Sequence, residues 1–181
     1  MFTDCPKIYV ASLSDYNHGT LHGAWIELDG KDASEVSEEI TAMLEASPSA
    51  KAHGTKAEEY AIHDHECFGG LSIGEYDPIG ELVEKAEVIV EHGEDVGAGF
   101  LLHAADFGWE LDSFELRSRG LWGSFTEFAE ELFDDVYSDV VKAAEASSYL
   151  TVDYEGFARD LEADMATVVT REGVWVFEIN V

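Results

Sequence analysis

Residue types that bind metal ions are concentrated at His63-Asp64-His65-Glu66-Cys67. In a β-strand alternate side chains share a face, so His63 and His65 would point the same way and could begin a zinc site. A closed zinc site needs four ligands, and the sequence holds no second group of closely spaced Cys or His. The pattern therefore favours a polar strand end with ordinary histidines over a metal centre.

Other chemistry has weaker support in the sequence. Cys67 could act as a nucleophile only beside a base and an orienting group, which the sequence does not place. Gly69-Gly70 and Gly97-Ala98-Gly99 lack the spacing of a phosphate-binding loop or a dinucleotide fingerprint, so we expect flexible turns there. Carboxylates are so frequent that no pair indicates a glycosidase. We expect no catalytic residue and no cofactor.

The charge of the chain is far from balanced. Its 181 residues include 39 Asp and Glu against 10 Lys and Arg, a formal net charge of −29, while 46% of residues are apolar. That apolar content suits a folded core rather than disorder. The charge disfavours direct binding to nucleic acid or to an anionic membrane. No apolar run is long enough to span a bilayer, and two cysteines suit a reducing compartment, so we expect a soluble, cytoplasmic protein.

The first third of the chain has the pattern of a small α/β unit. Strand, turn and capping signals predict strands at Lys7–Leu13, Thr20–Leu28 and Glu58–His65, a turn at Asp15–Gly19, a helix from Asp32 or Ser34 to about Ala46, and a loop at Ala46–Ala57.

The remainder is helical and then mixed. Asp77-Pro78 suits a helix start, and apolar residues at helical spacing follow to His92. The same criteria predict helices at Asp95–Phe107, Asp112–Arg119, Ser124 to about Ala143, and Tyr154–Ala163, followed by a hairpin of Met165–Thr170 and Val174–Ile179.

The helix that begins after Ser124 separates apolar from acidic residues. An apolar stripe is predicted at Phe125, Phe128, Leu132, Val136 and Val140. The opposite side holds Glu127, Glu130, Glu131 and Asp134, flanked by Asp135 and Asp139. The like-charge pairs among these six acids cost about 1–3 kcal/mol before screening.

Three interpretations fit this acidic side: a solvated face, adaptation to molar salt, or imitation of nucleic-acid phosphates. Four acids over about 10.5 Å of helix give one charge per about 2.6 Å, against about 1.7 Å for duplex DNA. Charge density alone does not separate the last two interpretations.

Five segments of the chain resemble, in their order and spacing, those of a known family. They are Ile8–Leu13 with Tyr16-Asn17, Gly19–Trp25, Glu59–Asp64, Ile79–Leu82 and Asp153–Leu161. Together they span nearly the whole chain and resemble the ArdA antirestriction proteins.

The resemblance implies an α+β fold, drawn out into an elongated chain of three small domains with short mixed sheets and an acidic surface. The domains would be an α/β domain at 1–74, a helical domain at 75–117, and an α/β dimerisation domain at 118–181. Members of the family are homodimeric DNA mimics that occupy the DNA-binding groove of type I restriction–modification enzymes, at the methyltransferase core. This chain departs from the family pattern at Ala46–Ala57 and Ala143–Thr151, and the second departure touches the area associated with dimerisation.

Two sets of site residues follow from the resemblance and the charge pattern. The phosphate-mimicking acids would be Glu127, Glu130, Glu131, Asp134, Asp135, Asp139, Asp153, Asp160, Glu162 and Asp164. The dimer interface would include Tyr149, Leu150, Val152, Tyr154 and Phe157. The alternative is a small acidic enzyme or metal-binding protein adapted to high salt, with a site at His63 and His65. A repressor-binding or histone-like mimic would share the surface but have another target.

Overall fold

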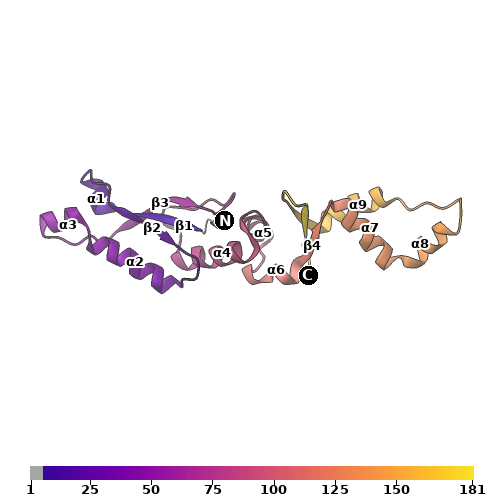
Figure 1. Cartoon of the computed structure of the whole chain (residues 1–181), viewed down its shortest axis with the longest axis horizontal. Helices are drawn as coiled ribbons and strands as arrows, with labels where there is room; N and C mark the ends of the chain where they lie inside the picture. The colour runs from indigo at the N-terminus through magenta and orange to yellow at the C-terminus, as the bar shows by residue number, and fades with distance from the viewer. Residues whose placement is uncertain (1–5) are drawn as a thin grey trace. The chain divides into compact units, whose positions relative to one another are not determined.

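The computed structural model describes residues 6–181, which divide into two compact units, one ending at Asp106 and one at Phe107–Val181. Within residues 6–181 the protein is a mixed α+β structure with nine α-helices and two three-stranded sheets (Figure 1). Every strand pairing is antiparallel, so the prediction of mixed sheets is wrong.

The first sheet has the strand order β2-β1-β3. Its strands are β1 (Lys7–Ser12), β2 (Gly23–Glu27) and β3 (Tyr60–Glu66), each of them predicted from the sequence. Alternation along β1 buries Ile8 and Val10 on one face. The opposite face carries the aromatic pair Tyr9 and Trp25, whose ring centroids lie 5.5 Å apart.

Three long helices complete the core of this unit. They are α2 (Ala33–Glu45), α4 (Ile79–His92) and α5 (Glu94–Phe107), and α2 and α4 lie along the same side of the sheet (Figure 1). Asp32 begins α2 with a full capping box, in which its side chain accepts from the backbone of Glu35. Asp77 does not cap α4 as predicted, because the helix begins one residue later and Asp77 Oδ2 instead accepts a hydrogen bond from Gly74 N–H.

Two short helices replace a predicted turn and a predicted loop. They are α1 (Leu13–Asn17) and α3 (Pro48–His53). Ser12 caps α1 and Ser47 caps α3, which ends at Gly54 with φ of +63°. Both helices are too short to show an apolar period, so only their caps could have indicated them.

The second sheet has the order β4-β6-β5. Its strands are β4 (Ser118–Trp122), β5 (Met165–Val169) and β6 (Val174–Glu178), and the predicted hairpin of β5 and β6 is confirmed. The helix predicted at Asp112–Arg119 is wrong only in its last two residues, because Ser118 and Arg119 belong to β4. A 3₁₀ turn at Leu111–Ser113 and α6 (Phe114–Arg117) lead directly into β4, whose pairing with β6 is a non-local contact.

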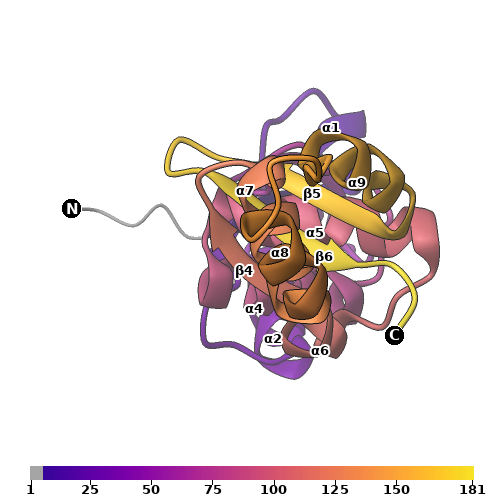
Figure 2. The same cartoon turned by 90° about the vertical axis from the view of Figure 1, so that its right-hand side faces the viewer.

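Three helices of the second unit follow β4 and precede the hairpin. They are α7 (Phe125–Val136), α8 (Ser138–Glu145) and α9 (Tyr154–Leu161), and a 3₁₀ turn follows at Glu162–Asp164. Figures 1 and 2 show α7 and α9 between the sheet and α8. The single helix predicted from Ser124 to Ala143 is wrong, because Tyr137 leaves the helical region (φ −116°, ψ 36°) and separates α7 from α8.

The first unit contains a buried carboxylate. Asp15 is fully buried on α1, where its Oδ1 accepts from Ser49 N–H at 2.8 Å near the start of α3. Burial raises the pKa of Asp15, and Oδ2 has no hydrogen-bond partner in the described part of the chain. Hydrogen bonds from Ser12, Ser47 and Ser49 outweigh the burial and hold the pKa of this carboxyl below its usual range. Asp15 therefore fixes α1 against α3.

Replacing Asp15 with Asn should lower the free energy of unfolding by about 1–3 kcal/mol at neutral pH, the cost of disturbing a buried charged hydrogen bond. Because the folded pKa lies below the unfolded value of about 3.9, this stabilisation is present above that value and is lost as pH falls through the folded pKa. Urea unfolding of both proteins across an acid series should show the difference shrink. Glu38→Gln removes an exposed carboxylate and is the control; equal losses for both variants would contradict the role of Asp15.

Two glycines of the first unit give opposite predictions for substitution by Ala. A Cβ at Gly97 would lie 2.7 Å from Ile89 Cα and 2.8 Å from Val88 O, whereas one at Gly80 would meet nothing within 4 Å. Gly97→Ala should therefore cost about 1–3 kcal/mol through overpacking of α4 against α5. Gly80→Ala should leave stability unchanged or raise it by up to about 1 kcal/mol. Thermal unfolding measures both, and equal effects would disprove the close helix contact.

Candidate partner-binding surface

The acidic row of α7 lies on one unbroken helix. Glu127, Glu130, Glu131 and Asp134 are all exposed between Phe125 and Val136. The spacing of about 2.6 Å per charge expected for a helix therefore applies along this face. The six other predicted acids, Asp135, Asp139, Asp153, Asp160, Glu162 and Asp164, are exposed as well.

Capping and packing hold the acidic face of α7 outward. Ser124 Oγ accepts from Glu127 N–H at 3.1 Å, and Glu127 Oε2 accepts from Gly123 N–H at 3.0 Å. On the opposite side Phe128 and Ala129 are buried, and the Phe128 ring lies 5.4 Å from that of Trp122 on β4. Burial of the apolar side leaves the carboxylates facing solvent.

The apolar stripe predicted along this helix ends sooner than expected. Phe125 and Leu132 are half-buried, but Val136 is 61% exposed and Val140 is 51% exposed. The break at Tyr137 explains the exposure of Val140, because that residue lies on a separate helix, whereas Val136 is already exposed as the last residue of α7. None of the described residues of α8 is buried within this chain.

An aromatic cluster joins α9 to α7. The Phe133 ring lies 4.8 Å from Tyr137, 5.5 Å from Tyr154 and 5.1 Å from Phe157. Asp153 caps α9, since its Oδ1 accepts from Gly156 N–H at 2.9 Å. The contact brings the acids of α7 and those at and after α9 onto neighbouring helices of one unit.

Asp134 and Tyr154 form the shortest link between these helices. The Tyr154 hydroxyl donates to Asp134 Oδ1 at 2.6 Å. This hydrogen bond, together with burial and the negative charges of Asp134, Glu130 and Glu145, raises the pKa of Tyr154 to about 12. Asp134 is therefore held in one position on the acidic face.

The predicted acids differ in how firmly they are held. Glu127, Asp134 and Asp153 accept hydrogen bonds within the chain, and Asp139 lies 3.8 Å from Lys142 Nζ in an exposed ion pair. The others have no side-chain hydrogen bond or ion pair to any residue of 6–181: Glu130, Glu131, Asp135, Asp160, Glu162 and Asp164. Most of this charge is therefore uncompensated.

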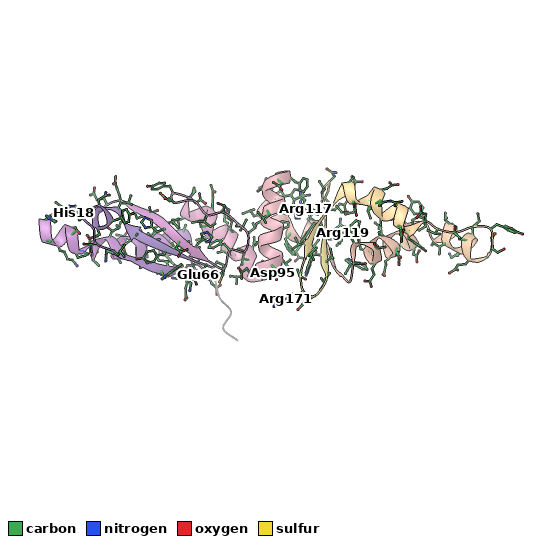
Figure 3. The ribbon with its side chains drawn as sticks, turned by 90° about the horizontal axis from the view of Figure 1, so that it is seen from above. His18, Glu66, Asp95, Arg117, Arg119 and Arg171 are labelled. Carbon is green, nitrogen blue, oxygen red and sulfur yellow. The ribbon has the colours of Figure 1, made fainter. Side chains whose placement is uncertain are left out.

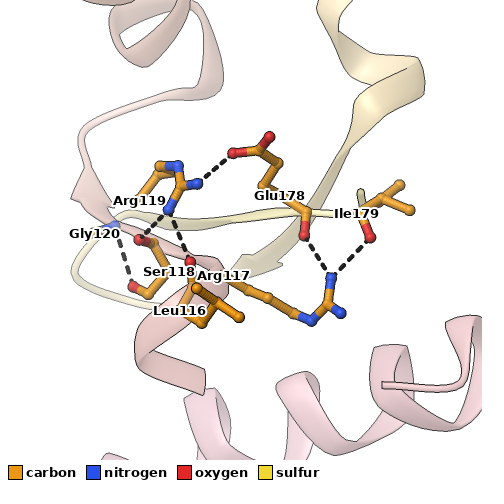
Figure 4. Close-up of polar contacts among 7 residues, drawn as sticks. All are labelled: Leu116, Arg117, Ser118, Arg119, Gly120, Glu178 and Ile179. Atoms are coloured by element: carbon orange, nitrogen blue, oxygen red, sulfur yellow. Dashed lines mark hydrogen bonds and ion pairs between the residues drawn. The ribbon is translucent and has the colours of Figure 1, made fainter. Parts of the chain in front are cut away.

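Arg117 at the end of α6 and Arg119 on β4 bind oxygens other than those of the α7 acids. Arg117 Nη1 donates to the carbonyls of Glu178 (3.2 Å) and Ile179 (2.8 Å), and its guanidinium lies 4.6 Å from the Trp109 ring centroid. Arg119 pairs with the Glu178 carboxylate and donates to the carbonyl oxygens of Leu116 and Ser118 (Figure 4). Figure 3 shows Arg117 and Arg119 beside the sheet. No pattern in the sequence indicates these contacts. Neither arginine neutralises the acids of α7.

The residues predicted for a dimer interface fall into two groups. Tyr154 and Phe157 pack inside the unit against Phe133. Tyr149 is 94% exposed, Leu150 is largely exposed, and Val152 is half-buried. Leu150 and Val152 line a hollow of about 440 Å³ beside α8.

The two histidines of the segment His63–Cys67 contact different aromatic rings. A β-bulge shifts the pairing so that Tyr9 faces Asp64 while Val10 faces Ile62, which breaks the alternation on which a shared face depended. The His63 ring contacts Tyr16 at 5.3 Å, and the His65 ring contacts Phe68 at 5.7 Å. Within residues 6–181 no group of three or more His, Cys, Asp or Glu could hold a metal ion.

The comparison with protein families decides the relationship. A family model described as antirestriction protein (ArdA) matches residues 8–176, nearly the whole chain and both units. The chain belongs to the ArdA antirestriction protein family. Membership makes it an antirestriction protein, of the kind that inhibits restriction–modification enzymes. The search of curated proteins finds no match.

A helix that spans a membrane must be both long and apolar, and the described helices of this ArdA-family chain fall short of that. In the part of the chain that the structure describes, none is long and apolar enough to cross a bilayer.

The ionisation of Tyr154 tests the link to α7. Its pKa of about 12 exceeds the unfolded value of about 10, so the link stabilises the fold fully below pH 10 and is lost as pH rises through 12. Ultraviolet titration of tyrosinate should show one late step that Tyr154→Phe removes. Tyr149→Phe is the control and should leave that step in place. A late step that survives Tyr154→Phe would contradict the assignment.

Proposed function

We propose that this protein inhibits type I restriction–modification enzymes by occupying the groove in which they bind DNA. The exposed row of carboxylates on α7, in a chain of the ArdA family, supports the proposal most directly. The acids of α7, α9 and the turn after it would take the places of phosphates. The lysines and arginines of the groove, in the methyltransferase core, would bind them.

The chemistry of such a surface needs acids without neighbouring bases. Between Thr126 and Asp164 the sequence has 12 acids, and its only Lys or Arg residues are Lys142 and Arg159. A DNA-binding groove is built to neutralise phosphates, so it attracts this surface over a Debye length of about 10 Å at 0.1 M salt. The inhibitor then needs no catalytic residue, cofactor or metal, and acts in the cytoplasm where its target acts.

The proposal includes an elongated, acidic homodimer. Two chains carry twice the net charge of −29, which matches about 100 Å of duplex DNA at one charge per about 1.7 Å. Each chain would have an α/β domain at 1–74, a helical domain at 75–117 and an α/β domain at 118–181. The last would form the dimer through exposed residues such as Tyr149 and Leu150, together with Val136 and Val140.

The high-salt alternative is not favoured. It relied on a site at His63 and His65, whose rings contact different neighbours. A mimic must also fold near physiological ionic strength, whereas halophilic surfaces commonly need molar salt.

Neutralising the α7 row tests the proposal. Each of Glu127→Gln, Glu130→Gln, Glu131→Gln and Asp134→Asn should weaken inhibition by about 0–1 kcal/mol, up to about fivefold, because exposed ion pairs contribute little singly. The four together should weaken it by more than tenfold. The measurement is displacement of labelled DNA from a type I methyltransferase.

A matched control keeps the charge and changes only the side-chain length, with Asp at the three Glu positions and Glu at Asp134. This variant should inhibit nearly as well as the natural protein. Complete loss of inhibition from one folded single variant would favour a discrete site. A ternary complex of methyltransferase, DNA and inhibitor, or an inhibitor affinity indifferent to salt, would contradict mimicry.

A further inference from the structure

A groove lies in the first unit beside β3, away from the acids of α7 in the sequence. It consists of two hollows of about 530 and 470 Å³, both lined by Leu13. The apolar and aromatic side chains that line this β3 groove are Leu13, Tyr16, Tyr60, Ile62, Ile73 and Tyr76. The two hollows together are large enough for several side chains of a short peptide segment.

Backbone hydrogen bonds fix the walls of the β3 groove. Leu13 N–H donates to Glu59 O at 3.0 Å, which joins α1 to the segment entering β3. On the other side Ile62 N–H donates to Glu75 O at 2.9 Å, so the segment after Ile73 is attached to β3. The groove is therefore formed before any partner arrives.

The charge of the groove selects a cation. Five carboxylates line it, from Glu58, Glu59, Asp64, Glu75 and Asp77, and all but Asp77 are exposed. Among the described lining residues there is no Lys or Arg, and the remaining titratable side chains besides the tyrosines are His63 and His65. Such a surface repels nucleic acid and attracts a positively charged side chain.

The exposed tyrosines of the groove favour arginine over lysine as the cation that binds there. Tyr16 is 56% exposed and Tyr76 is 69% exposed, so both rings are accessible to a partner. An aromatic face beside carboxylates suits a guanidinium, which stacks on rings, is weakly hydrated and binds carboxylates with two parallel hydrogen bonds. An ammonium is more strongly hydrated and gains less from the rings.

The chain satisfies its own cations in the same way. Lys7 Nζ lies 5.2 Å from the Trp25 ring centroid and 2.7 Å from Glu66 Oε2. Arg117 lies over Trp109 in the second unit. Both contacts pair a cation with a ring and with oxygen acceptors, the combination that the β3 groove offers to a partner.

Two sequence segments that carry the ArdA resemblance meet at this groove. Tyr16 belongs to the first, and Glu59–Asp64 form the second. The acids of α7 do not involve either segment. We infer that the β3 groove binds an arginine-containing segment of a protein partner, through Tyr16, Tyr76 and the surrounding carboxylates. This inference goes beyond the proposed function in two respects. The acids proposed to replace phosphates lie on α7, α9 and the turn after it, whereas the β3 groove lies in the first unit. The groove also offers aromatic rings, which have no counterpart among DNA phosphates.

Peptide binding tests the inference without any restriction enzyme, so its failure is separable from failure of the mimicry proposal. The probes are a short acetylated and amidated glycine-serine peptide with two arginines, and its counterpart with two lysines. The natural full-length protein should bind the arginine peptide several-fold more tightly. Amide chemical shifts in NMR spectra should change at Tyr16, at Tyr76 and along β3.

Tyr16→Ala and Tyr76→Ala should each weaken binding of the arginine peptide by about two- to fivefold, the effect of an exposed cation–π contact. Both side chains are more than half exposed, so the variants should fold, which circular dichroism checks. Leu21→Ala, at a residue of the first unit that is 86% exposed and does not line the groove, is the control and should bind as the natural protein does. Asp64→Asn with Glu75→Gln should weaken both peptides.

Equal affinity for the two peptides, or tyrosine variants that bind as tightly as the Leu21→Ala control, would overturn the inference and leave only general attraction between opposite charges. Shift changes spread over α2, α4 and α7 rather than gathered at β3 would overturn it as well.

Discussion

Repulsion among carboxylates is the constraint under which this chain folds. A net charge of −29 on 181 residues opposes every compact arrangement, so apolar burial and local hydrogen bonds must offset it in each unit. In the first unit Ile8, Val10, Val36 and Leu82 are fully buried between sheet and helices. In the second, Val176 and Phe177 of β6 are fully buried. The acids are tolerated because these cores keep them on the outside.

Two of the few basic side chains, Arg117 and Arg119, bind backbone carbonyl oxygens. Arg117 binds the carbonyls of Glu178 and Ile179 after β6, and Arg119 binds those around the start of β4. A guanidinium has several N–H donors and can therefore bind more than one of these oxygens at once. Because Arg117 and Arg119 bind carbonyl oxygens, they do not neutralise the outward carboxylates of α7. The unneutralised carboxylates of α7 and the arginine contacts of the second sheet thus follow from one distribution of charge.

Elements with their own local pattern could be predicted from the sequence, and elements defined by distant contacts could not. Helix α2 has a capping box and an apolar stripe, and β5 and β6 form a hairpin around a short turn. By contrast, β4 exists because Leu121 and Trp122 pair with Trp175 and Val174, some fifty residues away. The break at Tyr137 has no proline or glycine to announce it. Short helices such as α3 depend on Ser47 and on the buried Asp15 rather than on periodicity.

The same distinction applies to the acidic surface. The helical period placed Glu127, Glu130, Glu131 and Asp134 on one side of α7 correctly, because amphipathicity is a local property. The apolar stripe was wrong beyond Leu132, because Val136 is exposed at the end of α7 and Val140 lies beyond the break at Tyr137 on a separate helix. The hydrogen bond between Asp134 and Tyr154 crosses twenty residues and two helices, and no spacing indicates it.

That hydrogen bond distinguishes Asp134 from its neighbours in how it can meet a partner. A free Glu such as Glu130 loses rotamer freedom when it binds, up to about 2 kcal/mol for a long side chain. Asp134 is already held by Tyr154, so less of its freedom remains to be lost, although its Oδ1 is partly occupied. The aromatic cluster around Phe133 in turn holds Tyr154 in place. The α7 row therefore combines two oriented carboxylates, Glu127 and Asp134, with two freer ones, and the freer ones can adjust to basic side chains whose spacing differs from that of the helix.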